Sequence, residues 1–321
     1  MPRHPVLLFT AALALAAMVG PASAQSSRTF RSQTDLVTIN VSVQNDRDAY
    51  VANLTADQFA VFEDGVPQTI RFFASGDLPL DLVVLLDISG SMRSSLPLVQ
   101  EAAINFTRAA RRGDRVAVMG ISNGLRILQP LTADLQAVEA AIRSSRAQGR
   151  TPLYSAVYVA LRELAVDRER QREPRRQAIV VLSDGLDTAS SFSFDDLLVA
   201  ARRSAVPVYA IAPRVSQAKQ MRRERLGFDS TSSVDYELRL LARDTGGRAF
   251  FPTTLGDLDG VYTDIAGELA HAYSVAFESS NGARDGRFRQ LTVRVDAPGV
   301  RWRNRPGYQA PGTVSMTDLG R

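Results

Sequence analysis

From residue 82 onward, short apolar runs alternate with amphipathic runs, and this alternation restricts the fold more than any other feature of the sequence. The pattern is typical of βαβ units, which build a parallel sheet with helices on its faces. The run 82–86 is wholly apolar, as expected for a strand buried on both faces in the middle of such a sheet. The predicted strands are 82–86, 116–121, 178–182, 206–212 and 248–251, and the predicted helices are 96–111, 134–144, 153–164, 194–203, 236–244 and 255–269.

The segments on either side of this region show the alternation of half-buried strands. Apolar residues recur at every second position over 37–43 and again over 291–295. An Asp64-Gly65 pair between two strand-like runs indicates a hairpin, and Pro67 indicates the start or the edge of a strand. We therefore expect an α/β domain inserted between the two halves of a β domain, although two separate small β units would leave the same pattern.

The expected fold class is α/β, with a doubly wound, mostly parallel, Rossmann-like sheet flanked by a β-sandwich-like region built from the N- and C-terminal segments. A chain of 321 residues is long enough for two domains. The expected organisation is a signal peptide over 1–24, an N-terminal β segment over 25–79, the α/β domain over 80–270, a C-terminal β segment over 271–310 that packs with 25–79, and a flexible tail over 311–321.

The N-terminus has the composition of an export signal. A basic start at Arg3 and His4 precedes an apolar stretch over 6–19, and Pro21-Ala22-Ser23-Ala24 ends it with a small-x-small pattern. We predict cleavage after Ala24 and a periplasmic or secreted protein. An uncleaved membrane anchor is the alternative, but the stretch is short for a spanning helix, which needs about 20 residues. No later segment is long and apolar enough to span a membrane.

Several classes of site are excluded by the residue inventory. The chain has no Cys, so it forms no disulfide and carries no lipid on an N-terminal cysteine. Removal of the signal leaves His271 as the single histidine, which excludes Ser-His-Asp triads, multi-histidine zinc sites and HExxH helices. The formal net charge of +4 is too small to single out nucleic acid as a partner.

A cluster of oxygen-bearing side chains follows the 82–86 run directly. Asp87, Ser89 and Ser91 occupy alternate positions, and Gly90 lets the backbone turn tightly. Ligand sites in open α/β sheets lie just beyond the carboxyl ends of the strands. These three side chains are therefore placed where a hard cation such as Mg²⁺ could be held.

The spacing Asp87-x-Ser89-x-Ser91 resembles the metal-ion-dependent adhesion site of von Willebrand factor type A domains, which three separated loops assemble. The segment 149–156 is similar to the second loop, with Thr151 as the metal-facing hydroxyl, and 180–185 is similar to the third, with Asp184 as its acid. The order of the flanking β segments also resembles that of bacterial exported proteins with related domains.

This resemblance implies a Mg²⁺ site, or a Mn²⁺ or Ca²⁺ site, formed by Asp87, Ser89, Ser91, Thr151 and Asp184. It further implies that the partner is a protein presenting an Asp or Glu carboxylate, that the ion acts in adhesion rather than catalysis, and that the chain is not an enzyme.

Each candidate ligand also has an ordinary structural interpretation. Asp87 could cap a helix, Thr151 could be an N-cap before Pro152, and Asp184-Gly185 could form a turn. At the level of function, the alternatives are a metal-dependent hydrolase that uses Asp87 and Asp184, and a structural module with a vestigial site.

Three further features receive the simpler of two interpretations. Asp187 is interpreted as a solvated loop acid rather than a residue that tunes the site. The arginine-rich runs 168–176 and 222–225 are interpreted as solvated helix ends or loops, with a docking patch for an acidic partner as the alternative. His271 is interpreted as structural.

Overall fold

A computed structural model describes residues 36–76, 78–171, 173–183, 187–213, 230–254 and 256–312. The predicted signal peptide, Asp184, the run 222–225 and most of the predicted tail lie outside these residues. The part of the chain from Asp35 onward forms one compact unit. None of the helices described in it is long and apolar enough to cross a membrane.

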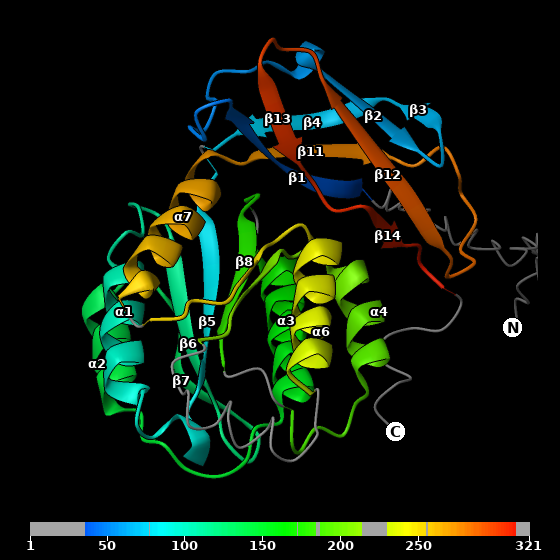
Figure 1. Ribbon diagram of the computed structural model, residues 1–321. Coiled ribbons are helices and arrows are strands. Elements are labelled where there is room, and N and C mark those ends of the chain that lie inside the picture. Colours follow the sequence, from blue (N-terminus) through cyan, green and yellow to red (C-terminus); the bar gives the residue numbers. More distant parts are fainter. Residues whose placement is uncertain are drawn as a thin grey trace, which may run out of the picture. The chain divides into compact units, whose positions relative to one another are not determined.

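A six-stranded sheet forms the centre of the α/β region, in the order β10-β9-β8-β5-β6-β7 (Figure 1). All neighbouring strands are parallel except β7, which runs antiparallel to β6. The predicted parallel sheet is thereby confirmed, with β5 at its centre. The strands are β5 (Leu80–Asp87), β6 (Arg115–Ile121), β7 (Leu125–Thr132), β8 (Arg176–Leu182), β9 (Val208–Ile211) and β10 (Ala249–Phe250).

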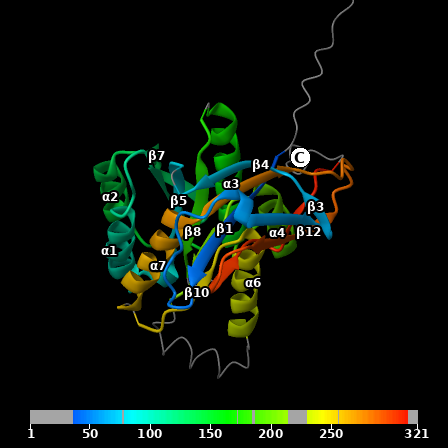
Figure 2. The same cartoon turned by 90° about the horizontal axis from the view of Figure 1, so that it is seen from above.

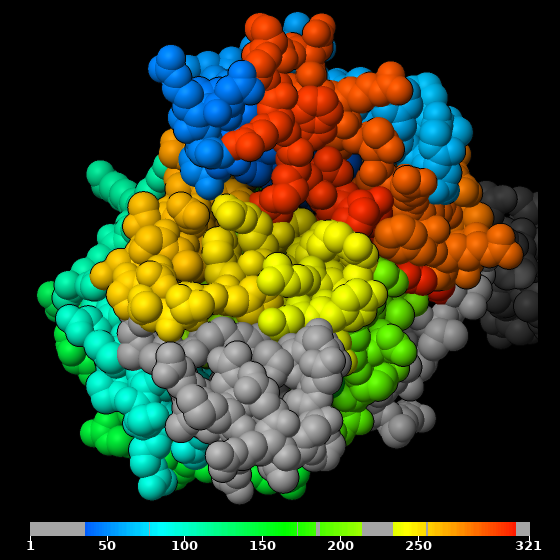
Figure 3. Space-filling view, in the orientation of Figure 1, coloured from blue at the N-terminus to red at the C-terminus, as the bar shows by residue number. Residues whose placement is uncertain are grey.

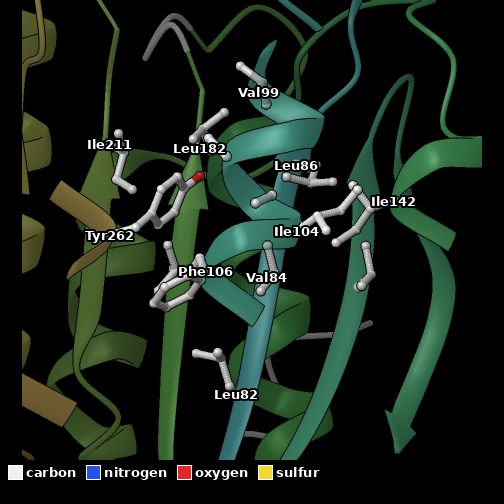
Figure 4. Packing of buried hydrophobic residues seen from close by; sticks show 14 of the residues in the cluster. Leu82, Val84, Leu86, Val99, Ile104, Phe106, Ile142, Leu182, Ile211 and Tyr262 are labelled. Atoms are coloured by element: carbon white, nitrogen blue, oxygen red, sulfur yellow. The ribbon is translucent and has the colours of Figure 1, made fainter. Parts of the chain in front are cut away.

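Helices cover both faces of this sheet, which explains why β5 is apolar at consecutive positions. Leu82, Val84 and Leu86 point to one side, where they pack with residues of α1, α2 and α7 (Figure 4). Val83 and Leu85 point to the other side and pack with α3, α4 and α6. The helices are α1 (Leu96–Thr107), α2 (Leu135–Ser144), α3 (Leu153–Arg170), α4 (Phe194–Ser204), α6 (Ser230–Thr245) and α7 (Asp257–His271), and short 3₁₀ turns are η1 (Ala56–Gln58) and η2 (Gly90–Met92).

Strand β7 is the element of this sheet that the sequence analysis did not predict. It follows β6 after a tight turn and lies at the edge of the sheet, where one side has no neighbouring strand among the described residues. Its sequence contains Pro130 and lacks regular alternation, and its pairing with β6 contains register shifts. Such a strand is tolerated at an edge because an edge needs only half of the ladder hydrogen bonds.

The remaining strands form two four-stranded antiparallel sheets, with the orders β13-β1-β11-β4 and β14-β12-β2-β3 (Figure 1). Figure 2 shows β1 and β4 of the first sheet and β3 and β12 of the second from above. Strands from opposite ends of the chain pair directly, β1 with β11 and β2 with β12. Inward-facing residues of both sheets share one hydrophobic core, so the expectation of a β-sandwich built from both terminal segments is confirmed, and that of two separate units is wrong. The strands are β1 (Leu36–Asn45), β2 (Phe59–Glu63), β3 (Val66–Gln68), β4 (Ile70–Ser75), β11 (Tyr273–Glu278), β12 (Phe288–Val295), β13 (Val300–Arg303) and β14 (Gly307–Gln309).

The predicted hairpin forms at Asp64-Gly65, where both residues have positive φ angles, of 47° and 82°. It joins β2 to β3, and Pro67 lies in β3 at the edge of its sheet, as expected. The following apolar run does not continue β3. It forms β4, which pairs with β11 in the other sheet of the sandwich.

The C-terminal strands contact the α/β region through Arg303. Its guanidinium donates hydrogen bonds of 2.6 Å to the carbonyl oxygens of Gly246 and Gly247, and it also pairs with Glu268 of α7. In the space-filling view, the C-terminal strands lie directly against the segment that contains α6 and α7 (Figure 3). A charged side chain thus joins the two parts.

Candidate metal centre

Asp87 and Ser183 meet at the carboxyl ends of two neighbouring strands. Leu86 of β5 is paired with Leu182 of β8, so the next residue of each strand emerges at the same edge. The hydroxyl of Ser183 donates a hydrogen bond of 2.7 Å to Oδ2 of Asp87, while Oδ1 accepts the backbone N–H of Ser89 at 2.9 Å. Asp87 is fully buried, and its carboxylate joins the first loop to the third rather than capping a helix.

Ser89 and Ser91 place two hydroxyl groups next to this carboxylate. Their Oγ atoms lie 3.0 Å apart. Ser89 is buried and Ser91 is exposed, so the two hydroxyls lie at the boundary between the interior and the surface. Met92, which follows them, is buried in the core beneath α1 and has a packing role.

The second loop is fastened to the first by backbone hydrogen bonds. Gly149 accepts the N–H of Gly90 at 3.0 Å, and the N–H of Gln148 donates to the carbonyl of Ile88 at 2.7 Å. Gly149 has a φ angle of +76°, and a Cβ atom there would lie 2.6 Å from the side-chain amide of Asn123. A side chain at position 149 would therefore strain the backbone and displace Asn123, which lies in the turn between β6 and β7.

Thr151 is buried behind this contact, at 3% exposure. Its N–H donates to Oγ1 of Thr188 at 3.0 Å, and its carbonyl accepts the N–H of Thr188 at 2.9 Å. The first residue before helix α3 is Pro152, so Thr151 does not act as the N-cap. Within the part of the chain that the structure describes, the Thr151 hydroxyl forms no hydrogen bond, which leaves its oxygen open to a ligand.

Asp187 joins the third loop to the start of α3, and its interpretation as a solvated loop acid is wrong. The half-buried carboxylate accepts the backbone N–H groups of Tyr154, Ala189 and Ser190 at 3.0, 3.2 and 3.0 Å, as well as the hydroxyl of Ser190. A negative charge at this position is favourable because unpaired N–H groups gather at a helix N-terminus. Asp187 therefore fixes the second and third loops to each other.

At the second residue of α3, Tyr154 links this helix to α6. Its hydroxyl donates a hydrogen bond to the carboxylate of Glu237, and its ring packs edge-on against Phe194 of α4. Burial, reinforced by the neighbouring carboxylate, raises the pKa of the Tyr154 hydroxyl above its usual range. Tyr154 therefore remains a neutral hydrogen-bond donor at physiological pH.

Sequence reasoning missed the residues that support the site rather than those that could bind an ion. Ser183 orients Asp87, Asn123 accepts the N–H of Arg150 at 2.9 Å, and Ser122 donates to the carbonyl of Gln148 at 2.6 Å. The one available signal was the position of Ser183, a polar residue that directly follows a buried strand. The other two contacts join segments more than 25 residues apart, and no local pattern predicts them.

The donor groups fit a small divalent cation. In a six-coordinate Mg²⁺ site with metal–oxygen distances of about 2.1 Å, adjacent ligand oxygens lie about 3.0 Å apart. The Oγ atoms of Ser89 and Ser91 have this separation. No group of three or more His, Cys, Asp or Glu side chains able to hold a metal occurs among the described residues, so the candidate donors are mainly hydroxyls. Asp184, the second predicted acid, lies outside the residues that are described.

The other candidate features have structural roles. His271 stacks on Tyr50 with ring centroids 5.4 Å apart, in agreement with its structural interpretation. The interpretation of 168–176 as solvated is wrong for Arg175, which pairs with the buried Asp81, and for Arg176, which is itself buried. Both belong to the contacts beneath the sheet, at the end opposite Asp87.

The chain is similar to one protein-family model and to several solved structures. No curated protein matches the sequence. The solved structures that resemble the chain include proximal thread matrix protein 1 from the mussel byssus, with 18% identity, a TM-score of 0.47 and coverage of 61% of this chain and 49% of that one. The match thus spans about half of the mussel protein.

Two bacterial structures are also similar to the chain. BatB from Bacteroides thetaiotaomicron has 18% identity and a TM-score of 0.44, and the match covers 58% of this chain and 97% of that one. A von Willebrand factor type A protein from Catenulispora acidiphila has 15% identity and a TM-score of 0.47, with 90% of this chain and 77% of that one covered.

The family model of the von Willebrand factor type A domain matches residues 81–264, which is more than half of the chain. This range begins in β5 and ends in α7, and it contains all three loops described above. The protein therefore belongs to the von Willebrand factor type A domain family.

Proposed function

We propose that this chain is an exported, metal-dependent protein-binding module, in which a divalent ion at the ends of β5 and β8 mediates adhesion to an acidic residue of a partner protein. The observation that carries the proposal is the convergence of three loops at the carboxyl end of β5, through the Asp87–Ser183 hydrogen bond and the Gly90–Gly149 contact.

The proposed ligands are Asp87, Ser89, Ser91, Thr151 and Asp184. The hydroxyls of Ser89, Ser91 and Thr151 would hold Mg²⁺, Mn²⁺ or Ca²⁺, which all prefer oxygen ligands. Neutral oxygens leave most of the positive charge uncompensated. An Asp or Glu carboxylate from a partner would then supply an anionic oxygen, which is the chemistry that the bound ion contributes to recognition.

We further propose that the site is not catalytic. The carboxylate of Asp87 already accepts two hydrogen bonds and is buried, so it is poorly placed to act as a general base. Nucleic acid is not expected as a partner. The segment 1–24 is proposed to direct export, with cleavage after Ala24 and release into the periplasm or the medium.

Calorimetric titration of the purified mature chain with MgCl₂ and MnCl₂ tests the proposal. We expect one site in the wild type and its loss in both Asp87→Asn and Asp184→Ala, while Asp195→Ala, an exposed acid in the first turn of α4, should bind as the wild type does. If the folded wild-type protein bound neither ion, the chain would be a structural module with a vestigial site. Hydrolysis of generic phosphoesters that is lost in Asp87→Ala would instead support a hydrolase.

A further inference from the structure

A pocket of about 440 Å³ lies between the β-sandwich and the base of the α/β region. The outward-facing side chains of Leu36, Thr38 and Phe72 line it on the sandwich side, and Arg168, Gln171 and Arg175 line it on the other. Asp81, at the start of β5, also lines the pocket. Asp87 is the last residue of the same strand, so the pocket lies about 20 Å from the candidate metal centre. Pockets of about 300–1,000 Å³ between domains commonly hold small molecules.

Some of the charges around this pocket compensate one another. The fully buried carboxylate of Asp81 forms ion pairs with Arg115, at 2.7 Å, and with Arg175, at 2.8 Å. Arg115 forms a second ion pair with Asp167, at 2.6 Å. These two guanidinium groups and two carboxylates form a closed network. They leave no excess charge for a ligand.

Arg168 and Arg305 stand outside this network, and neither forms an ion pair with a carboxylate in the described part of the chain. Arg168 donates to Oε1 of Gln177 at 2.9 Å. Arg305 is 4% exposed and donates a hydrogen bond of 2.6 Å to the carbonyl of Thr38 in the pocket wall. Its buried Nε atom has no hydrogen-bond partner among the described residues. Burial, and to a smaller extent the positive charge of Arg168, lower the pKa of Arg305 to about 10.

The C-terminus of α4 compensates part of this positive charge. Arg168 donates to the carbonyl of Ser204 at 3.2 Å, and Arg305 donates to that of Arg202 at 3.3 Å. A helix C-terminus carries about half a negative charge. Glu173, an exposed residue that also lines the pocket, reduces the excess further without cancelling two guanidinium charges. The surroundings therefore favour an anion.

The opposite wall of the pocket carries exposed apolar side chains beside the polar Thr38, Asn40 and Ser274. Leu36 is 50% exposed and Phe72 is half-buried, although both lie on the outer face of their sheet, where polar residues are usual. Ala276 of β11 extends this wall. A ligand that matched both walls would carry a negative group at one end and an aliphatic or aromatic body at the other.

We propose that this pocket binds a small organic anion with an apolar body, whose carboxylate or sulfonate lies near Arg168 and whose body packs against Leu36 and Phe72. This site is independent of the candidate metal centre, since the two lie at opposite ends of the sheet. Binding should therefore be unchanged by a chelator.

Fluorescence titration with 1-anilinonaphthalene-8-sulfonate and with its uncharged counterpart N-phenyl-1-naphthylamine, both in EDTA, tests the proposal on the mature wild-type chain. We expect saturable binding of the sulfonate at one site, about tenfold or more tighter than that of the neutral probe, which corresponds to one charge-assisted contact. Decanoate should compete with the sulfonate, and acetate should not. Equal affinities for the two probes, or no saturable binding, would overturn the proposal.

Two variants locate the site. Arg168→Gln should weaken the sulfonate about tenfold and leave the neutral probe unchanged, whereas Arg162→Gln, an exposed arginine on the same helix outside the pocket, should affect neither. Thr38→Trp should block both probes, because it fills the pocket without removing a charge. Sulfonate binding that persists in folded Arg168→Gln and Thr38→Trp would place the probe elsewhere and refute the assignment.

Discussion

The hydroxyl of Ser183 donates a 2.7 Å hydrogen bond to Oδ2 of Asp87, across the ends of two adjacent parallel strands. This contact fixes the orientation of the carboxylate before any ion binds. It also ties the third loop to the first, so that the candidate donors share one rigid base at the edge of the sheet.

Loss of this hydrogen bond should weaken the proposed metal site without unfolding the protein. Residues that orient a ligand typically contribute about 10- to 100-fold to metal affinity, so we expect Ser183→Ala to lower Mg²⁺ affinity at least tenfold in calorimetry. Ser144→Ala removes a hydroxyl that bonds only to the local carbonyl of Ala141, and it should leave affinity unchanged. Equal affinities in the two variants would contradict a positioning role for Ser183.

The approach of the second loop should depend on Gly149. Alanine there would force a left-handed φ of +76° on a residue with a Cβ atom and bring that atom to 2.6 Å from Asn123. We expect Gly149→Ala to lower the free energy of unfolding in urea by about 1–3 kcal/mol. Gly260→Ala is the matched control, because Gly260 is exposed in α7 with no atom near its missing Cβ, and it should stabilise by up to about 1 kcal/mol.

Tyr262 is a buried tyrosine whose hydroxyl has no hydrogen-bond partner among the described residues. Its replacement by Phe removes an unsatisfied polar group and keeps the ring contact with Phe106, so we expect Tyr262→Phe to stabilise by about 1 kcal/mol in urea denaturation at pH 7. The comparison is Tyr209→Phe, which loses a hydrogen bond of 2.7 Å to Glu268 and should destabilise by a similar amount. A destabilised Tyr262→Phe would show that this hydroxyl does have a partner.

The same tyrosines predict sensitivity to alkali. Burial raises the pKa of Tyr262 and of Tyr209 above the unfolded value near 10. The unfolded chain therefore releases these protons first, so the stability that they contribute is complete below pH 10 and falls as the pH rises above it. Urea denaturation between pH 8 and 11 should show a smaller decrease in Tyr262→Phe than in the wild type, and equal decreases would argue against this coupling.

The contact between the sandwich and α7 should depend on the pairing of Arg303 with Glu268. Glu268 is buried, and removal of Arg303 would leave its carboxylate with Tyr209 as the remaining donor among the residues that the structure describes. We expect Arg303→Met to destabilise by about 3 kcal/mol in urea denaturation. The double variant Arg303→Met/Glu268→Gln should recover part of this loss, and simple additivity of the two single variants would show that the pair is not coupled.

Much of the α/β region could be predicted from local patterns. The consecutive apolar residues of 82–86 and 178–182 predicted strands buried on both faces, and both lie centrally in the sheet. The run 194–203 predicted α4, and Ser193 and Asp196 form a reciprocal capping box at its start. Strand β7 could not be found in this way, because an edge strand needs neither strong periodicity nor a continuous apolar run.

The sequence by itself determined the alternation of strands and helices, the presence of β segments at both ends, and the position of Asp87, Ser89 and Ser91 just beyond a central strand. These features are encoded by residue type and spacing within a few positions. Tertiary structure decided the pairing of β1 with β11, the pairing of β4 with β11 rather than with β3, and the contacts of Ser183, Asn123 and Asp187. Each of these contacts joins residues that are distant in the chain. Burial of a shared core brings them together, and no local sequence pattern predicts it.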